Sequence, residues 1–275
     1  MSKRREKRHH GIRNFIIYCL ILVAIWYAGT FTLKTTEVTV ESSKLKDDLT
    51  IVQLTDLHGS SFGQGNSRLI ERVKDAKPDF IVITGDMYSS GDEKGKQTAI
   101  NLMTDLAKFC PVYFVNGEHD NNETFDKQLT AAGVEVLDYE SKDITVGRTT
   151  VRLYGISNVY YSSTFDLANE FTLDEGIFNI LAAHIPNFEA FADFGIDLSL
   201  CGDSHGGQVR LPFVGGFNNG GVWFPELLDG EGKYVKGLYE MGDKKLFVSS
   251  GLGNFPFPIR FLNRPEVAVI HLSGE

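Results

Sequence analysis

Short apolar runs alternate with helical patterns through the first half of the chain, and this alternation restricts the fold more than any other feature. The runs at 50–55, 80–84 and 111–115 have the length and apolar character of buried strands. Between them, the segments 67–76 and 96–109 carry apolar residues at the spacing of one helix face. A strand–helix series of this kind predicts a largely parallel sheet flanked by helices, and therefore an α/β fold.

Further strand-like runs follow in the second half of the chain. They are more than one open sheet would comfortably hold, so we expect two packed sheets. The segment 212–243 is rich in glycine and shows no periodicity, and we expect it to be a long surface loop. The additional strands are expected at 144–146, 151–156, 177–183, 198–201, 246–250 and 267–272.

An uncharged apolar segment lies near the N-terminus. Its nineteen residues, 15–33, would form a helix of roughly 28 Å, which matches the hydrocarbon thickness of a bilayer. Residues 1–13 hold six lysines and arginines and one glutamate, a net charge of +5, while the other 262 residues carry −14. Because the cations cluster on the N-terminal side of the segment, the positive-inside rule predicts that 1–13 stay in the cytoplasm and that the rest of the chain is exported. The acidic body argues against a nucleic-acid partner, because a phosphate backbone attracts Lys and Arg.

Two interpretations of this segment stay open, an uncleaved anchor and a cleaved signal peptide. A signal peptide usually has an apolar core of roughly 7–15 residues and a small-residue cleavage site, and neither feature is clear here. Trp26 and Tyr27 lie where an interfacial aromatic belt would begin. We therefore expect a single-pass cell-membrane protein with an extracytoplasmic domain. The expected organisation is a basic cytoplasmic segment at 1–13, a transmembrane signal anchor at 14–34, a linker at 35–48 and one domain at 49–275.

Three cysteines are too few for a disulfide framework. Cys19 lies in the apolar segment, and Cys110 and Cys201 are far apart in the sequence. Two buried free thiols are the simpler expectation for the latter pair, and a bridge between them is the alternative.

Acids, histidines and glycines follow directly after five of the predicted strands. Because ligands bind at the carboxyl ends of parallel strands, five such clusters can converge on one site. A single Asp-x-His or Gly-Asp pair after a strand is more often a turn, and a lone buried histidine is more often structural. The ordered series of carboxylate and imidazole side chains favours a site for two metal ions. The clusters are Asp56 with His58, Asp86, Glu118 with His119 and Asp120, His184, and Asp203 with His205.

This ordered series resembles the motif set of the calcineurin-like metallophosphoesterases. The similarity covers about 49–275 and includes the runs GGQVRLPF (206–213) and SSGLGN (249–254). It is closest to the membrane-anchored or exported bacterial branch, which includes the UDP-2,3-diacylglucosamine hydrolase-like and YkuE-like phosphodiesterases. The resemblance implies a four-layer α/β/β/α sandwich that hydrolyses phosphoesters with two divalent ions drawn from Mn, Mg, Fe or Zn.

Carried over position by position, the resemblance implies two adjoining metal sites. Asp86 would bridge the two ions. The second ion would take its other ligands where the family has Asn, His and His, and these positions are Glu118, His184 and Asp203 here. The first ion would be held by Asp56, His58, Asp86 and His205.

The resemblance also implies how the reaction would proceed. A hydroxide bridging the two metals would attack phosphorus, and His119 would protonate the leaving group. Asp120 would orient His119. The chain shows neither a G-x-S-x-G nucleophile motif nor a P-loop.

Glu118 and Asp203 depart from the family pattern, and both belong to the second metal site. The family pattern has two ligating carboxylates against two divalent ions, whereas four carboxylates here would balance the ions completely. An oxygen-rich second site should prefer a hard ion such as Mn²⁺, Mg²⁺ or Ca²⁺ over Zn²⁺. A neutral cluster should also acidify a bound water less, which predicts a more alkaline pH optimum and weaker phosphate inhibition. The paired change is interpreted as retuning, with impairment as the alternative.

Two functions of different classes follow from these residues. The first is a membrane-anchored phosphodiesterase or pyrophosphatase whose substrate is a lipid-linked phosphoester at the outer membrane face, or else a soluble nucleotide or polymer phosphodiester. The second is a catalytically impaired relative that binds metal or a phosphorylated ligand. The retained His119 favours the enzyme. The glycine-rich stretch 214–222 and the aromatics Trp223, Phe224, Phe255 and Phe257 would border the substrate or pack the loop.

Overall fold

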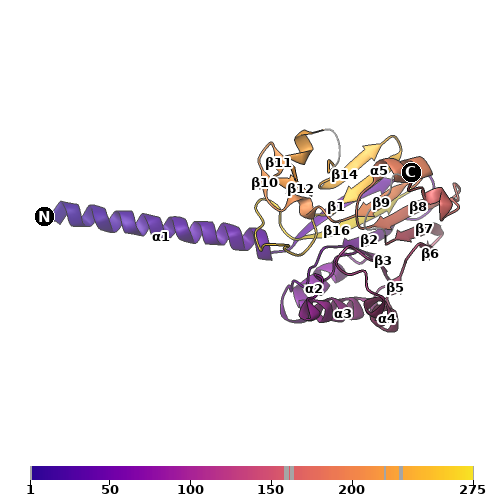
Figure 1. The fold of residues 1–275 in the computed structure, drawn as a ribbon, viewed down its shortest axis with the longest axis horizontal. Helices are drawn as coiled ribbons and strands as arrows, with labels where there is room; N and C mark the ends of the chain where they lie inside the picture. The colour runs from indigo at the N-terminus through magenta and orange to yellow at the C-terminus, as the bar shows by residue number, and fades with distance from the viewer. Residues whose placement is uncertain (1, 158–160, 162–163, 220, 229–231, 275) are drawn as a thin grey trace.

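Two six-stranded sheets form the body of the molecule (Figure 1). The computed structural model describes residues 2–274 apart from 158–160, 162–163, 220 and 229–231, and the backbone alone at 2–10. The first sheet has the order β1-β16-β2-β3-β4-β5. Its strands are β1 (Lys34–Glu41), β2 (Leu49–Leu54), β3 (Phe80–Thr84), β4 (Val112–Val115), β5 (Glu135–Val136) and β16 (Glu266–Ser273).

The second sheet has the order β14-β15-β9-β8-β7-β6. Its four central strands, β15, β9, β8 and β7, run parallel, as β2 to β5 do in the first sheet, so the predicted parallel pairing is confirmed. The strands are β6 (Glu140–Val146), β7 (Thr149–Ile156), β8 (Phe178–Ala183), β9 (Leu198–Cys201), β14 (Gly237–Met241) and β15 (Lys244–Val248).

Apart from the N-terminal helix, the helices lie on the outer faces of the two sheets (Figure 1). Residues of α2 to α4 pack with one face of the first sheet, a second apolar cluster fills the space between the sheets, and α5 packs on the second sheet. This is the four-layer α/β/β/α arrangement that the resemblance implied. The helices are α1 (Ser2–Phe31), α2 (Ser67–Asp75), α3 (Glu93–Ala107), α4 (Glu123–Ala131) and α5 (Phe188–Phe194).

The segment 212–243 carries more structure than the expected surface loop. Two short hairpins form within and just before it, and β14 adds an edge strand to the second sheet. Two-residue strands are too short to leave a periodic pattern in a sequence, which explains why the segment looked featureless. The additional elements are β10 (Arg210–Leu211), β11 (Gly215–Gly216), β12 (Asn218–Asn219), β13 (Val222–Trp223) and the 3₁₀ turns η1 (Gln64–Asn66), η2 (Leu167–Asn169), η3 (His205–Gly207) and η4 (Pro225–Leu227).

Strand β1 (Lys34–Glu41) occupies the first half of the segment 35–48 that the sequence predicted to be a linker. It pairs with β16 over its full length, from Lys34 opposite Glu266 to Glu41 opposite Ser273. Its sequence KTTEVTVE combines β-branched residues with charged ones, as an edge strand requires. The polar half of that alternation gives the segment the composition of a linker, although it belongs to the folded domain.

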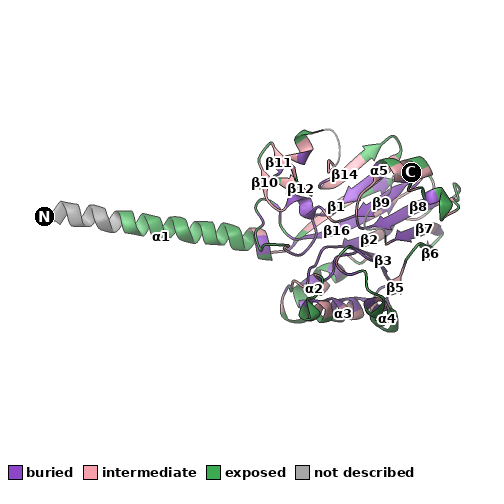
Figure 2. Ribbon diagram, viewed as in Figure 1, coloured by how far each residue is buried: buried purple, intermediate pink, exposed green. Residues whose placement is uncertain are grey.

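Helix α1 leaves the body from one end of the molecule (Figure 1). Among the described residues it is the one helix long and apolar enough to cross a membrane, over Gly11–Phe31, and a signal sequence near an N-terminus would meet the same criterion. From Gly11 onward its side chains are exposed except near its C-terminal end (Figure 2). There, Trp26 Nε1 donates to Pro258 O at 2.9 Å, and Arg260 N donates to Thr30 Oγ1 at 3.2 Å.

The three cysteines are free. Cys110 and Cys201 are buried and Cys19 is exposed, so the expectation of two buried free thiols is confirmed.

Candidate metal centre and active site

The loops after five strands meet at one edge of the two sheets. Asp56 follows β2, Asp86 follows β3 and His119 follows β4, while His184 follows β8 and Asp203 follows β9. Backbone hydrogen bonds lock these loops to one another: Asp56 N donates to Gly85 O at 3.0 Å, and Gly202 N donates to His184 O at 2.9 Å. The two sheets therefore present their polar clusters to one another, as the strand-end pattern predicted.

Several of these residues have an unusual backbone conformation. A positive φ is uncommon outside glycine and costs free energy, of order 1–3 kcal/mol, so it persists where the surroundings impose it. Such residues concentrate at functional sites. Five of the expected metal ligands have it: Asp56 (φ 50°), His58 (43°), Asp86 (54°), Asp203 (71°) and His205 (49°).

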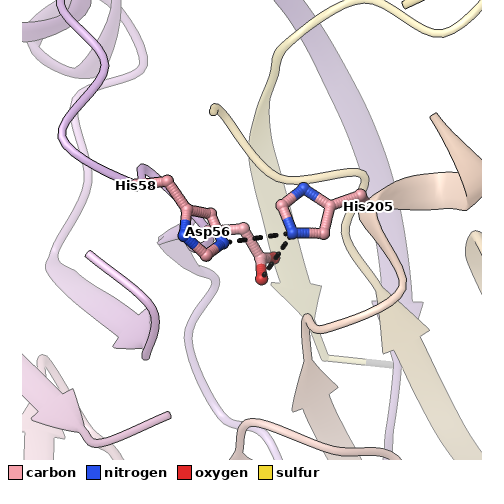
Figure 3. Close-up of side chains that lie close together, drawn as sticks. All are labelled: Asp56, His58 and His205. Carbon is pink, nitrogen blue, oxygen red and sulfur yellow. Dashed lines mark hydrogen bonds and ion pairs between the residues drawn. The ribbon is translucent and has the colours of Figure 1, made fainter. Parts of the chain in front are cut away.

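The first group of side chains is formed by Asp56, His58 and His205 (Figure 3). The Nε2 atoms of His58 and His205 face one another at 3.2 Å, and His205 Nε2 lies 3.7 Å from Asp56 Oδ1. Asp86 Oδ2 lies 3.6 Å from His58 Nε2. Two imidazole nitrogens and carboxylate oxygens converging in this way form a donor set suited to a divalent cation.

The second group is arranged around His184. Its Nε2 lies 3.4 Å from Asp86 Oδ2, 3.8 Å from Asp203 Oδ1 and 3.9 Å from Asp56 Oδ1. On the other side of the ring, Nδ1 lies 2.7 Å from Thr84 O, a contact that holds a proton on Nδ1 and directs Nε2 at the carboxylates. Asp86 Oδ2 contacts both groups, and its role as the bridging ligand stays a prediction.

The buried carboxylates of the cluster would be stabilised by a bound cation. Burial raises the pKa of Asp56 to about 7, with Asp86 and Asp203 adding to the effect. For His184, burial opposes the charged form, but the surrounding carboxylates, led by Asp86, raise its pKa well above the usual value. Asp56 Oδ2 and His184 Nε2 are buried and have no hydrogen-bond partner among the described residues. Buried carboxylates and an orphaned ring nitrogen fit a pair of bound metal ions.

Glu118 and Asp203, the two departures from the family pattern, lie on the open side of this cluster. About a third of each side chain is exposed, 35% for Glu118 and 34% for Asp203. Burial raises the pKa of Asp203, and the charge of Glu118 adds to the effect. Asp203 approaches His184 directly, whereas Glu118 Oε1 lies 3.5 Å from His119 Nε2.

Asp120 contacts the loop backbone instead of the His119 ring that it was expected to orient. Its carboxylate accepts hydrogen bonds from Met87 N and Gly117 N, both at 2.7 Å, and burial raises its pKa to about 7. The Nδ1 of His119 lies 3.3 Å from Ser90 Oγ, which also donates to His119 O at 3.0 Å. Asp120 thus ties the loop after β4 to the loop after β3, and Ser90 contacts the ring.

Sequence reasoning missed both Ser90 and its neighbour Ser89, whose Oγ lies 3.0 Å from His58 Nδ1. The only available signal was that two serines follow Asp86 by a few residues. Serines are common in loops, so that signal is weak.

A cavity of about 760 Å³ opens above the cluster. Phe255 forms part of its wall: the ring stacks on His58 at 4.7 Å with an interplanar angle of 11° and meets the edge of His119 at 4.7 Å. Of the aromatics singled out in the sequence, Phe224 instead packs on Phe217 at 5.5 Å. The lining includes His58, Asp86, Glu118, His119, Asp203, His205, Phe217, Trp223, Phe255, Phe257 and Ile259.

Comparisons with known proteins agree with this geometry. The family model of the calcineurin-like phosphoesterases matches residues 49–207. The metallophosphoesterase YkuE of Bacillus subtilis is 29% identical to the chain, over 90% of the chain and 88% of that protein. A metallophosphoesterase of Campylobacter jejuni is 30% identical over the whole chain and 74% of its own length. The phosphodiesterase YaeI of Escherichia coli is 28% identical, over 81% of each protein.

The family model covers more than half of the chain, and the strand-end residues that it spans form one cluster with an adjoining cavity. The fold, the Asp and His groups able to hold metal ions, and the matched region agree with one another. The chain therefore belongs to the calcineurin-like phosphoesterase family and is a metal-dependent phosphoester hydrolase.

Proposed function

We propose that this protein is a membrane-anchored, binuclear phosphodiesterase or pyrophosphatase that acts on a lipid-linked phosphoester at the outer membrane face. The observation that carries the proposal is the placement of His119 beside two groups of ligands at the floor of one cavity. The name of the similar YaeI protein, a phosphodiesterase, supports diester chemistry. The apolar helix α1 supports the anchor.

In this proposal each cluster residue has one role. Asp56, His58, His205 and Asp86 would hold the first ion, and Asp86 also lies close enough to His184 to serve the second. The ions supply Lewis-acid polarisation of the phosphoryl group and activation of water at neutral pH. The second ion would be held, beside Asp86, by Glu118, His184 and Asp203.

His119 acts on the leaving group. Its ring borders the cavity, and the contact of Nδ1 with Ser90 directs Nε2 toward the ligand cluster. A ring held in this way can deliver a proton to a departing alkoxide or phosphate oxygen. Phe255 packs on both His58 and His119, which limits their movement and excludes water from that side.

The experiment uses the purified full chain in detergent, stripped of metal and reloaded separately with Mn²⁺, Mg²⁺ and Zn²⁺. Hydrolysis of bis(4-nitrophenyl) phosphate is measured against the monoester 4-nitrophenyl phosphate, with His119→Ala as the control variant. We expect metal-dependent turnover that favours the diester and falls only modestly in the variant, because nitrophenolate is a stable leaving group. Two bound ions without turnover of any phosphoester would instead favour the impaired binding protein.

A further inference from the structure

Helix α1 ends against a loop that also forms the mouth of the cavity. The 254–264 loop receives the hydrogen bond of Trp26 at Pro258 O, and Arg264 Nε donates to Thr32 O at 3.3 Å. The same loop contributes Phe255 and Phe257 to the cavity wall. The end of the apolar helix and the entrance to the cavity are therefore parts of one surface.

Large apolar side chains stand out from this surface into solvent. Phe257 is 67% exposed and Phe213 is fully exposed, at 104%. The segments that carry them are joined, because Arg210 N donates to Phe261 O at 2.9 Å and Phe261 N donates to Gln208 O at 3.2 Å. We call the exposed set the apolar rim: Phe213, Trp223, Leu227, Leu228, Phe257, Ile259 and Leu262.

A lipid bilayer is the occupant that the position of the rim favours. The exposed apolar side chains of α1 need lipid around them, and α1 is fixed at its last turns to the loop that carries part of the rim. In Figure 1 the hairpins β10 to β12 lie at the end of the body from which α1 leaves. A bilayer that surrounds α1 would therefore extend past the rim. An exposed cluster of this kind typically marks an interaction surface.

Arginines beside the helix end fit the headgroup layer. A second cavity, of about 420 Å³, lies where α1 meets the body and is lined by Phe31, Leu33, Arg68, Arg72 and Arg264, together with Glu71 and Asp75. Cations at this level attract anionic phosphate groups, each by about 1 kcal/mol. They would offset locally the acidic character of the body.

We propose that the apolar rim inserts into the outer leaflet beside α1, so that the cavity opens onto the headgroup layer and takes an amphipathic phosphoester whose chains remain in lipid. The inference rests on the proposed function for the chemistry of the site. The depth of the rim can be measured without any turnover, so the two claims can fail separately.

The two tryptophans of the chain make the test direct. Trp26→Phe leaves Trp223 of the rim as the single reporter, and the contacts of Arg260 with Thr30 and of Arg264 with Thr32 still join α1 to the loop in this variant. Trp223→Phe leaves Trp26 at the end of α1 as the reconstitution control. Each full-length variant is placed in phosphatidylcholine–phosphatidylglycerol vesicles with or without lipid brominated near the headgroup end of its chains. Because an inserted apolar face lies about 5–10 Å deep, we expect shallow bromines to quench Trp223 by about twofold.

Rim variants outside the cavity wall provide the matched comparison. Phe213→Ser with Leu262→Ser changes two exposed side chains and should reduce Trp223 quenching while leaving Trp26 quenching unchanged. The same pair should lower kcat/KM by about tenfold for a long-chain phosphodiester in vesicles, and leave kcat/KM for a short-chain soluble analogue unchanged.

Quenched Trp26 with unquenched Trp223 would overturn the proposal. So would a Trp223 signal that depends on the protein-to-lipid ratio, because it would assign the rim to a second copy of the chain.

Discussion

At the scale of single residues, the ligand cluster was predictable because each member lies within four residues of the end of a buried strand. Asp56 and Asp86 are examples: each carboxylate lies two residues after the last residue of its strand, β2 or β3. The contacts of Asp120 were not predictable, since one of its two partners, Met87 N, belongs to a different loop. The same holds for Ser90, because its approach to His119 depends on how two loops fold together. The spacing of residues along the sequence predicts contacts within one motif, but it does not predict contacts between motifs.

His119 should matter most for substrates with poor leaving groups. We expect His119→Ala to lower kcat by roughly 10²–10⁴-fold for an alkyl phosphodiester, because an alkoxide needs a proton as it departs. The loss should be much smaller for a nitrophenyl ester, whose leaving group is stable without one. Ser90→Ala removes the contact at Nδ1 of His119. It should also lower kcat more for the alkyl ester than for the nitrophenyl ester, with smaller losses than His119→Ala. Equal losses on both substrates would assign His119 to metal binding, and metal analysis of the variant would check that directly.

The two additional carboxylates should set the preference of the second site. We expect Glu118→Asn combined with Asp203→His to shift the chain from Mn²⁺ or Mg²⁺ toward Zn²⁺, because imidazole replaces a hard oxygen donor. The measurement is elemental analysis after loading metal-free protein with an equal mixture of Mn²⁺ and Zn²⁺. The single variant Glu118→Asn measures how much Glu118 alone contributes to the metal preference, since Glu118 contacts His119 while Asp203 contacts His184. An unchanged metal ratio in the double variant would remove the retuning hypothesis.

At the scale of elements, the buried strands were the easiest to predict and the edge strand was the hardest. The bounds of β3 match the sequence prediction residue for residue, because FIVIT is buried on both faces. Strand β1 was assigned to a linker because half of its side chains face solvent and are polar. What identifies it as a strand is its pairing with β16, more than 200 residues away, and no local pattern reports such pairing.

The loop after β4 should tolerate no side chain at Gly117. An added Cβ would overlap Oδ1 of Asp86, the carboxylate that contacts both ligand groups. We expect Gly117→Ala to weaken metal binding and abolish turnover while the thermal transition remains cooperative. Gly91→Ala is the matched control in the neighbouring loop, where nothing lies within 4 Å of the added atom and φ is 81°. That control should cost about 1 kcal/mol of stability through backbone strain and retain metal affinity.

At the scale of the whole molecule, charge and metal binding are linked to stability. Four carboxylates and three buried histidines meet at one edge of the two sheets, so the free energy of folding includes a repulsion that bound cations relieve. The raised pKa of Asp56, caused first by burial, reports that unfavourable environment. The candidate ligands come from loops of both sheets, so an ion bound to them would link the two sheets.

Metal removal should therefore lower the melting temperature of the full chain. A ligand present at one hundred times its Kd stabilises the folded state by about 2.7 kcal/mol when it does not bind the unfolded chain. Thermal unfolding in detergent, with and without a chelator, measures the shift. The variant Asp86→Ala should lose most of the chelator effect, because Asp86 contacts both groups. A melting temperature that does not respond to the chelator would show that the cluster holds no ion.

The central claim is that two ions bound at this cluster make the chain a phosphodiesterase. The most direct test titrates Mn²⁺ into the metal-free full chain and follows bound ions and phosphodiester turnover in the same samples. We predict that two ions bind per chain, that turnover rises with the second, and that Asp86→Ala abolishes both. Turnover in the metal-free chain, full turnover with one ion, or two bound ions with no turnover would contradict the account.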